Sequence, residues 1–115
     1  MKQQPPTRSI LIEARSRLER GWTQGVHAKN AAGDTVYVSD PSAVSYCATG
    51  ALMAAAKMEC PSIMDIGDLE AYRLLSAGLP GTKSIAGLQL FNDDPGRRQN
   101  EVLALFDSAI QRCQS

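Results

Sequence analysis

Apolar residues recur at the three- and four-residue spacing of a helix face in four segments of the chain. The most apolar of these segments follows Asp40 and contains mainly small or apolar side chains as far as Lys57. A helix that is apolar nearly all round is buried. The pattern therefore predicts a mainly α fold of about four helices, packed around a central helix at 41–57, with one small β-hairpin at 26–38.

The central helix is predicted to begin at Asp40 and Pro41. An aspartate before a helix accepts hydrogen bonds from unpaired N–H groups of the first turn, and proline suits the first helical position, where no donor is needed. Gly50 costs about 1 kcal/mol relative to alanine in a helix interior, so it indicates close approach of another helix or of a bound group. The polar residues of this segment form a narrow seam: Ser42, Ser45, Thr49 and Lys57.

The other helices are predicted at 7–20, from Met64 or Asp65 to Ala77, and at 97–112. The segment 85–90 is ambiguous and is compatible with a short helical turn. The buried positions of the first and last helices fall at helical spacing: Leu11, Ala14 and Leu18, then Val102, Leu105, Phe106, Ala109 and Cys113.

Two short alternating runs, 26–29 and 35–38, predict the strands of the hairpin. Gly33 lies in the loop between them and supplies the positive φ that a short hairpin loop needs. His27 and Tyr37 should then face outward or lie at an edge. The side chains expected to face inward are Val26, Ala28, Val36 and Val38.

Trp22 follows Gly21, which is predicted to end the first helix. We expect this tryptophan to fill the core beside that helix, with its indole N–H bonded locally. Stacking on a ligand is the alternative role.

Composition restricts the class of protein. A chain of 115 residues builds a core without disulfide or metal support, so we expect one helical domain at 7–115 behind a flexible arm at 1–6. The 12 basic and 12 acidic residues balance, which argues against binding nucleic acid through bulk charge. The three cysteines are odd in number and widely spaced, as expected of reduced thiols. With no apolar run of membrane-spanning length and no signal-peptide pattern, we expect a cytoplasmic protein.

Four segments, in this order, carry a resemblance to a known family: 21–25 (GWTQG), 43–52 (AVSYCATGAL), 91–95 (FNDDP) and 101–110 (EVLALFDSAI). They resemble a family of small uncharacterised proteins of bacteria and their phages with the motifs Trp-x-x-Gly, Trp-Cys-x-x-Gly-Ala-Leu and Trp-Asn-Asp. Two of the typical tryptophans are Tyr46 and Phe91 here. The resemblance, over about residues 20–111, implies no particular activity, cofactor or catalytic residue. It favours a phage or mobile-element accessory protein.

The densest polar cluster consists of Asn-Asp-Asp at 92–94 together with Arg97, Arg98 and Glu101. One interpretation is helix capping, since a carboxylate at a helix N-terminus satisfies free N–H groups and suits the helix dipole. The alternative is that the arginines and the helix start bind an anion such as a phosphate. The two aspartates would repel that anion unless they were neutralised.

No catalytic or metal signature accompanies these motifs. Cys47 and His27 would have to act as nucleophile and base, but a thiol inside an apolar helix lacks what lowers its pKa. A zinc site from these two residues with Cys60 and Cys113 has no ligand pair at the usual spacing. We therefore expect no catalytic residue, metal or cofactor, and an enzyme of unknown class ranks last.

Two functions of different classes remain. The first is a small non-enzymatic binding protein that occludes or recruits a host macromolecule. The second is a protein that binds or sequesters a small nucleotide-type anion. A shared cavity of a few hundred Å³ would favour the small ligand, whereas mutual bonding without a cavity would make the motif residues part of the scaffold. The candidate ligand-binding residues are Trp22, Tyr46, Thr49, Asn92 and Arg97.

Overall fold

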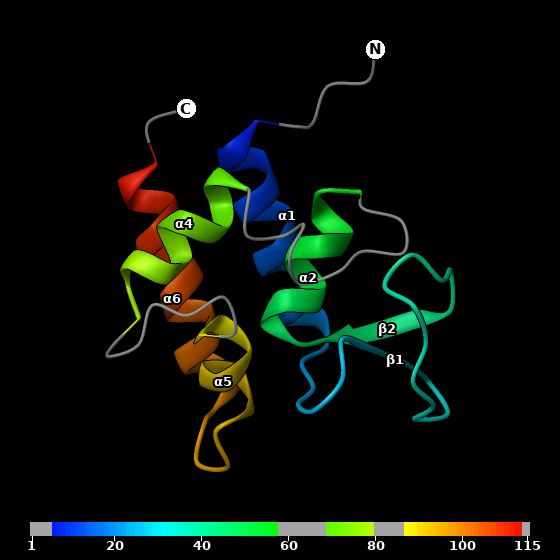
Figure 1. Ribbon diagram of the computed structural model, residues 1–115. Helices are drawn as coiled ribbons and strands as arrows, with labels where there is room; N and C mark the ends of the chain where they lie inside the picture. Colours follow the sequence, from blue (N-terminus) through cyan, green and yellow to red (C-terminus); the bar gives the residue numbers. More distant parts are fainter. Residues whose placement is uncertain (1–5, 58–68, 80–86, 114–115) are drawn as a thin grey trace.

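The computed structural model describes residues 6–57, 69–79 and 87–113 (Figure 1). The chain is mainly helical with a small two-stranded antiparallel sheet, which confirms the predicted fold class. Nearly all of the predicted arm, 1–6, lies outside the described residues. The elements in chain order are α1 (Thr7–Arg20), β1 (Ala28–Asn30), β2 (Ala43–Tyr46), α2 (Ala48–Ala55), α4 (Glu70–Ala77), α5 (Gly87–Asp93) and α6 (Gln99–Arg112).

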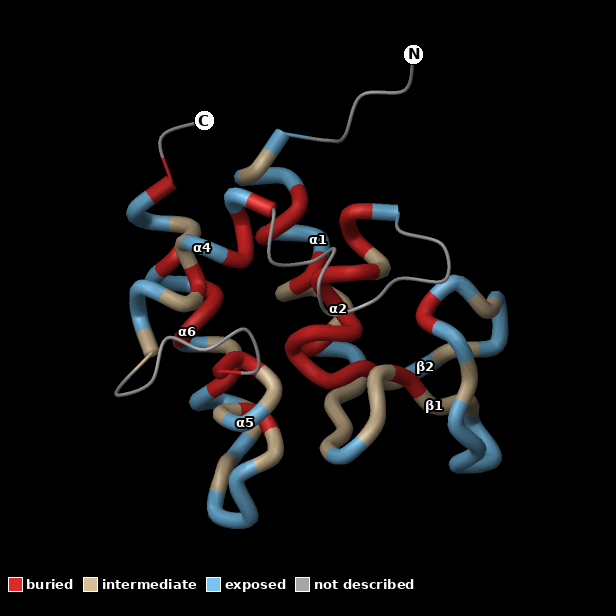
Figure 2. Tube along the Cα trace, viewed as in Figure 1, coloured by how far each residue is buried: buried red, intermediate tan, exposed pale blue. Residues whose placement is uncertain are grey.

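The core lies where α1 packs against α2 and α6, with α4 covering α6 (Figure 1). Buried positions line the facing sides of α1, α2 and α6, whereas the loop after β1 is mostly exposed (Figure 2). The predicted stripes of the first and last helices are confirmed. Their fully or nearly fully buried residues include Leu11, Ala14, Leu18, Val102, Phe106 and Ala109.

The predicted central helix is too long at its start. Residues 43–46 form the strand β2, and α2 begins only after Cys47, whose sulfur accepts a hydrogen bond from the Gly50 N–H at 3.2 Å. Asp40 is therefore not a helix cap. Its carboxylate accepts from the N–H and the hydroxyl of Ser42, at 2.8 and 2.7 Å, in a turn that leads into β2. The predicted polar seam is also wrong, because only part of it lies on a helix.

The strand partners also differ from the prediction. β1 pairs in antiparallel fashion with β2, with Ala28 opposite Tyr46. The expected second strand, 35–38, instead contributes one isolated bridge between Lys29 and Thr35. The turn itself is as predicted, since Gly33 has a φ of 88°. Ala28 and Val38 are buried and Tyr37 is 73% exposed, whereas Val26 and Val36 are only half-buried.

Helix ends account for the remaining differences. α6 begins at Gln99 rather than at residue 97, because Arg98 is extended and its N–H donates to the Glu101 carboxylate at 2.8 Å. α4 begins at Glu70, since Leu69 is extended; the predicted start at Met64 or Asp65 lies outside the described residues. The described part of the ambiguous segment, 87–90, belongs to α5, which extends through Asp93. The Asn-Asp-Asp cluster therefore ends one helix rather than capping the next.

Two glycines let the sheet approach the helices. A Cβ atom on Gly50 would lie 2.0 Å from the carbonyl oxygen of His27, and one on Gly21 would lie 2.2 Å from that of Val44. Neither distance is possible for a real side chain. The close approach predicted at Gly50 is present, but its partner is the backbone before β1 rather than another helix.

Candidate binding site

The side chain of Asn92 is the centre of a buried hydrogen-bond network. Its oxygen accepts from the Trp22 indole N–H at 2.8 Å and from the Ala48 backbone N–H at 2.9 Å. Its amide nitrogen donates to the Thr23 carbonyl at 3.1 Å and to the Asp93 carboxylate at 2.9 Å. Asn92 is fully buried, and two acceptor and two donor positions are the full capacity of an amide.

The network continues toward the surface through the neighbours of Asn92. The Gln24 side chain donates to the Asn92 carbonyl at 2.9 Å and to the Asp94 carbonyl at 2.8 Å. The Asp93 carboxylate accepts from the Gly25 N–H at 2.9 Å and from the Gln89 amide at 2.8 Å. The segment 22–25, the start of α2 and the end of α5 are thereby joined to one another.

The polar groups of the motif segments 21–25 and 91–95 thus form hydrogen bonds mainly with one another. The Trp22 indole N–H is bonded to a residue far along the chain, so the expected local bond is wrong. Thr49 is fully buried on α2, and its hydroxyl has no hydrogen-bond partner in the part of the chain that the structure describes. The structure brings Trp22 to Asn92 but does not gather all five candidate residues around one described cavity.

Arg97 and Tyr46 lie in separate contacts. The Arg97 guanidinium is 3.7 Å from the centre of the Phe91 ring, donates to the Phe91 carbonyl at 2.9 Å and lies 3.5 Å from the Glu101 carboxylate. The Tyr46 hydroxyl accepts from the Arg17 guanidinium at 2.8 Å. Both arginines thus have partners within the protein.

A hollow in the described part of the chain lies beside the network and shares Gly25, Gln89 and Asp93 with it. This main hollow has a volume of about 980 Å³ and is lined by the segments 25–27 and 35–38, by Asp40 and, from α5, by Gln89 and Asp93. Valine side chains and the exposed Tyr37 supply apolar surface, and the α5 residues supply a polar end. A mostly apolar wall with a few convergent polar groups is the usual make-up of a ligand site.

Two carboxylates give the main hollow its charge. Partial burial acts to raise the pKa of Asp93, but hydrogen bonds from Gln89, Gly25 and Asn92, with a contribution from His27, bring that pKa below its ordinary value. Hydrogen bonds from Ser42 likewise lower the pKa of Asp40. Neither carboxylate forms an ion pair with a lysine or arginine of the described residues. The main hollow is therefore acidic at neutral pH.

A second hollow, of about 410 Å³, shares Val38 and Asp40 with the main hollow. Its lining includes the Arg17 and Lys57 side chains and the Tyr46 ring. The Arg17 guanidinium lies 5.4 Å from the centre of that ring and 2.8 Å from the Glu13 carboxylate. Among the five candidate residues, Tyr46 alone lines either of the two described hollows.

The environment of Cys47 does not favour a nucleophile. Burial raises the pKa of its thiol to about 11, although the hydrogen bond from the Gly50 N–H and the hydrogen bond to the Gln89 side-chain oxygen act in the opposite direction. Its backbone N–H, not its thiol, contacts His27, through that residue's carbonyl at 3.2 Å. Within residues 6–57, 69–79 and 87–113, no three potential ligands among His, Cys, Asp and Glu gather where a metal ion could bind.

Sequence reasoning missed most of the main hollow. The segment 35–38 was predicted as a strand, and Gln89 lay in the ambiguous segment before the last helix. Two signals pointed to this region: the expected exposure of Tyr37 and the polar cluster that contains Asp93. Neither indicated that the two would border one hollow, because the residues are far apart in the chain.

No helix of the described residues has both the length and the apolar character required to cross a membrane.

A comparison with known proteins gives one family match. No curated protein and no solved structure matches the chain significantly. A family model described as "Family of unknown function (DUF6197)" matches residues 2–112. Because this match spans nearly the whole sequence, the chain belongs to the DUF6197 family of unknown function.

Proposed function

We propose that this protein is a non-enzymatic binding protein that receives part of a partner protein in the main hollow. The observation that carries the proposal is the contrast between the network and the hollow beside it. The polar groups of Trp22 and Asn92 form internal hydrogen bonds. The hollow instead offers apolar walls, an exposed tyrosine and two carboxylates that form no ion pair with a lysine or arginine of the described residues.

The frame of the main hollow supports a role in recognition. The Asp93 carboxylate is held by three hydrogen bonds, from the backbone of Gly25 and the side chains of Gln89 and Asn92. A side chain fixed in this way loses little conformational freedom on binding, so less of the interaction energy is offset by ordering. Tyr37, 73% exposed at the border of the hollow, belongs to a residue type enriched at protein interfaces.

The chemistry of the described groups favours binding over catalysis. The Cys47 thiol is almost wholly protonated at neutral pH, since its pKa is about 11. No hydrogen bond links the His27 side chain to Cys47, Thr35 or Tyr37, so these described residues do not form a nucleophile and base pair. The proposal therefore assigns no catalytic residue.

The resemblance to proteins of bacteria and their phages supports a more specific role. We propose that the protein acts in the cytoplasm as a phage or mobile-element accessory factor, with a host protein as its partner. A small folded domain with one docking hollow is sufficient to occlude or recruit such a partner. This role requires no cofactor.

Binding of a small anion is the second candidate function, and the second hollow supports it. Arg17 and Lys57 bring two cations to a space of about 410 Å³ whose lining has one carboxylate, that of Asp40, and Tyr46 is a further polar residue of the lining. Thermal-shift measurements with nucleotides and inorganic phosphate test this candidate. It predicts stabilisation that is reduced in K57Q and unchanged in K29Q, which alters a lysine outside both hollows.

Site-specific photo-cross-linking tests the proposed partner binding. A benzophenone amino acid is placed at position 37, at the main hollow, or at position 12, an α1 residue that is 47% exposed and lines neither hollow. In bacterial lysate, position 37 should give a discrete cross-linked species that V36D, in the wall of the hollow, removes. Equal cross-linking from both positions, or none from position 37, would contradict the proposal.

A further inference from the structure

We propose that the main hollow recognises a partner segment through a lysine or arginine side chain, whose cationic end is attracted by the Asp93 and Asp40 carboxylates of the lining. This inference rests on the proposed function, because it names the chemistry of the partner that the hollow receives. The hollow itself provides the docking site, and its charge selects the occupant.

The lining of the main hollow carries two carboxylates and, among basic side chains, His27 alone. Asp93 and Asp40 both line it, and no lysine or arginine does. Their carboxylates form no ion pair within the described residues. An anionic ligand would meet two like charges here, whereas a cationic ligand would meet two opposite ones. Charge complementarity therefore favours a cation.

Both carboxylates keep acceptor positions free. An ionised carboxylate has about four acceptor positions, and three are used on Asp93: two on Oδ1, by Gly25 and Asn92, and one on Oδ2, by Gln89. On Asp40, Oδ1 takes both hydrogen bonds from Ser42, and no described group bonds to Oδ2. An ammonium or guanidinium group has several N–H donors that suit these free positions.

The apolar wall selects a long side chain rather than a bare ion. Val26, Val36 and Val38 line the same hollow as the two carboxylates. Lysine and arginine bury their methylene stems along such surfaces while the charged end bonds at a polar site. Tyr37, also in the lining, provides an aromatic face for a cation. A divalent metal has less support, since no three-residue ligand group forms among the described residues.

The size and openness of the hollow favour a peptide segment over a free amine. A space of about 980 Å³ reaches the upper end of the range for small-molecule sites. It therefore has room for the backbone and the neighbouring residues that flank a basic side chain. A free polyamine shares the cationic chemistry, so it serves as the competing probe.

The test is a titration of the uniformly ¹⁵N-labelled full chain, followed by NMR. The probes are the peptide acetyl-Ala-Val-Lys-Val-Ala-amide, the same peptide with norleucine in place of lysine, and spermidine. The lysine peptide should shift the amide signals of Gly25, Tyr37 and Asp93, and added salt should weaken its binding. Norleucine keeps the aliphatic stem without the charge, so the norleucine peptide should bind at least about fivefold more weakly than the lysine peptide.

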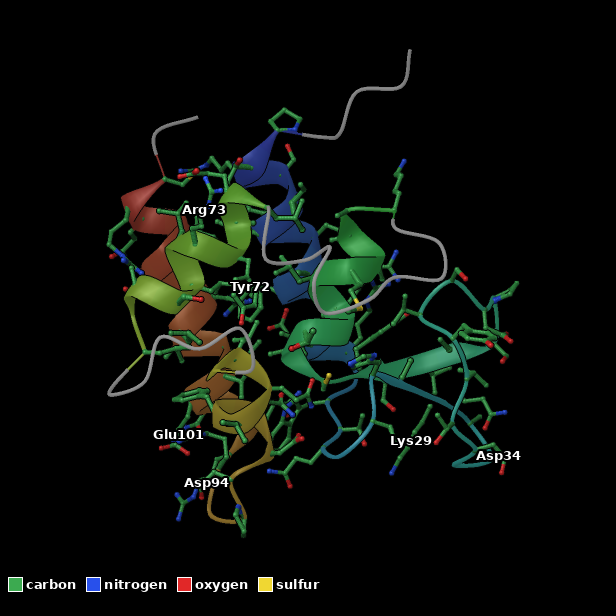
Figure 3. All side chains as sticks on the ribbon, in the orientation of Figure 1. Lys29, Asp34, Tyr72, Arg73, Asp94 and Glu101 are labelled. Carbon is green, nitrogen blue, oxygen red and sulfur yellow. The ribbon has the colours of Figure 1, made fainter. Side chains whose placement is uncertain are left out.

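Three variants locate the charge that is recognised. D93N and D40N should each weaken binding of the lysine peptide by about fivefold. D94N is the matched control, because Asp94 is exposed, lies outside the lining, and is well separated from Lys29 and Asp34 of the β1 region (Figure 3). D40N lies outside the Asn92 network and keeps the test valid if D93N disturbs folding.

Several outcomes overturn the inference. Equal binding of the lysine and norleucine peptides would do so, as would equal weakening by D94N and D93N. If spermidine shifts the same amide signals and binds as tightly as the lysine peptide, the natural ligand is a free amine rather than a protein segment, and the inference is overturned. A position-37 cross-link that persists in D93N and D40N overturns the inference alone, whereas a cross-link that never forms in the unaltered chain overturns the proposed function.

Discussion

The indole N–H of Trp22 donates to the side-chain oxygen of Asn92 at 2.8 Å, across 70 positions of the chain. The same oxygen accepts from the first N–H of α2, at Ala48. One buried atom therefore fixes the segment after α1, the start of α2 and the end of α5. A buried polar network of this kind specifies one arrangement strongly, because each unpaired member is costly in a medium of low dielectric.

N92A should destabilise the protein by about 3 kcal/mol, because it leaves the buried Ala48 N–H and partly buried groups of Trp22 and Thr23 without partners. Urea denaturation followed by circular dichroism measures the change. N100A replaces an exposed asparagine on α6 and should change stability by only about 0.5 kcal/mol or less. Similar losses in both variants would contradict the role assigned to Asn92.

G50A should destabilise the fold by about 2 kcal/mol or more, because the new Cβ would lie 2.0 Å from the His27 carbonyl oxygen. In an ordinary helix the same change would be stabilising. G96A is the matched control, since its Cβ would be 3.6 Å from the Asp94 carboxylate, an ordinary contact. Urea midpoints compare the two, and unchanged stability in G50A would show that the contact is not close.

Because of the Asp93 carboxylate, the free energy of unfolding should depend on pH in the acid range. Partial burial opposes ionisation, but the bonds from Gln89, Gly25 and Asn92 prevail and lower its pKa in the folded state. Its contribution is therefore present above the ordinary value of 3.8 and is lost as the pH falls through the lower folded value. The difference in unfolding free energy between the unaltered chain and D93N should shrink below about pH 4. A pH-independent difference would contradict this assignment.

Because of the Cys47 thiol, the free energy of unfolding should fall as the pH rises in the alkaline range. Burial raises the pKa of its thiol from 9.0 to about 11, so its contribution is complete below pH 9 and is lost as the pH rises through about 11. Relative to C47S, the unaltered chain should lose about 2 to 3 kcal/mol across this interval. Native Cys47 should also resist iodoacetamide at pH 8 and react in urea, which mass spectrometry detects. Rapid modification of the native protein would contradict burial of the thiol.

Y46F tests whether binding at the main hollow is independent of the Tyr46 hydroxyl, since Tyr46 lines the second hollow. The change removes the acceptor of the 2.8 Å hydrogen bond from Arg17 and should cost about 1 kcal/mol of stability. Cross-linking from position 37 should remain, because Tyr46 does not line the main hollow. Loss of cross-linking in a folded Y46F protein would indicate that the two hollows act as one site.

The long amphipathic helices were predictable, because a 14-residue stripe such as that of α1 carries its own signal. The segment 40–57 was not. Asp40 and Pro41 suit a turn as well as a helix start, since an aspartate bonds to the backbone two residues on in both settings. The small side chains that follow gave no period that separates β2 from α2.

The site was less predictable than the fold. The polar residues of the motifs could be selected from the sequence, but the Trp22–Asn92 bond joins segments with no local relationship. The main hollow depends on the path of the chain between β1 and β2, which follows from the pairing of those strands. That pairing was misassigned because Val36 and Val38 alternate as a strand would, while only Thr35 forms a bridge.

The packing of α1 against α6 determines when during synthesis the protein can fold. The Gln99 side chain donates to the Leu18 carbonyl at 2.7 Å across 81 positions, and the two helices lie side by side (Figure 1). Chains emerge from the ribosome N-terminus first, so Leu11 and Leu18 lack much of their cover until α6 has been made. A nascent chain that stalls before α6 should therefore be a chaperone client and a protease substrate, and the native state should form only after translation has passed that helix.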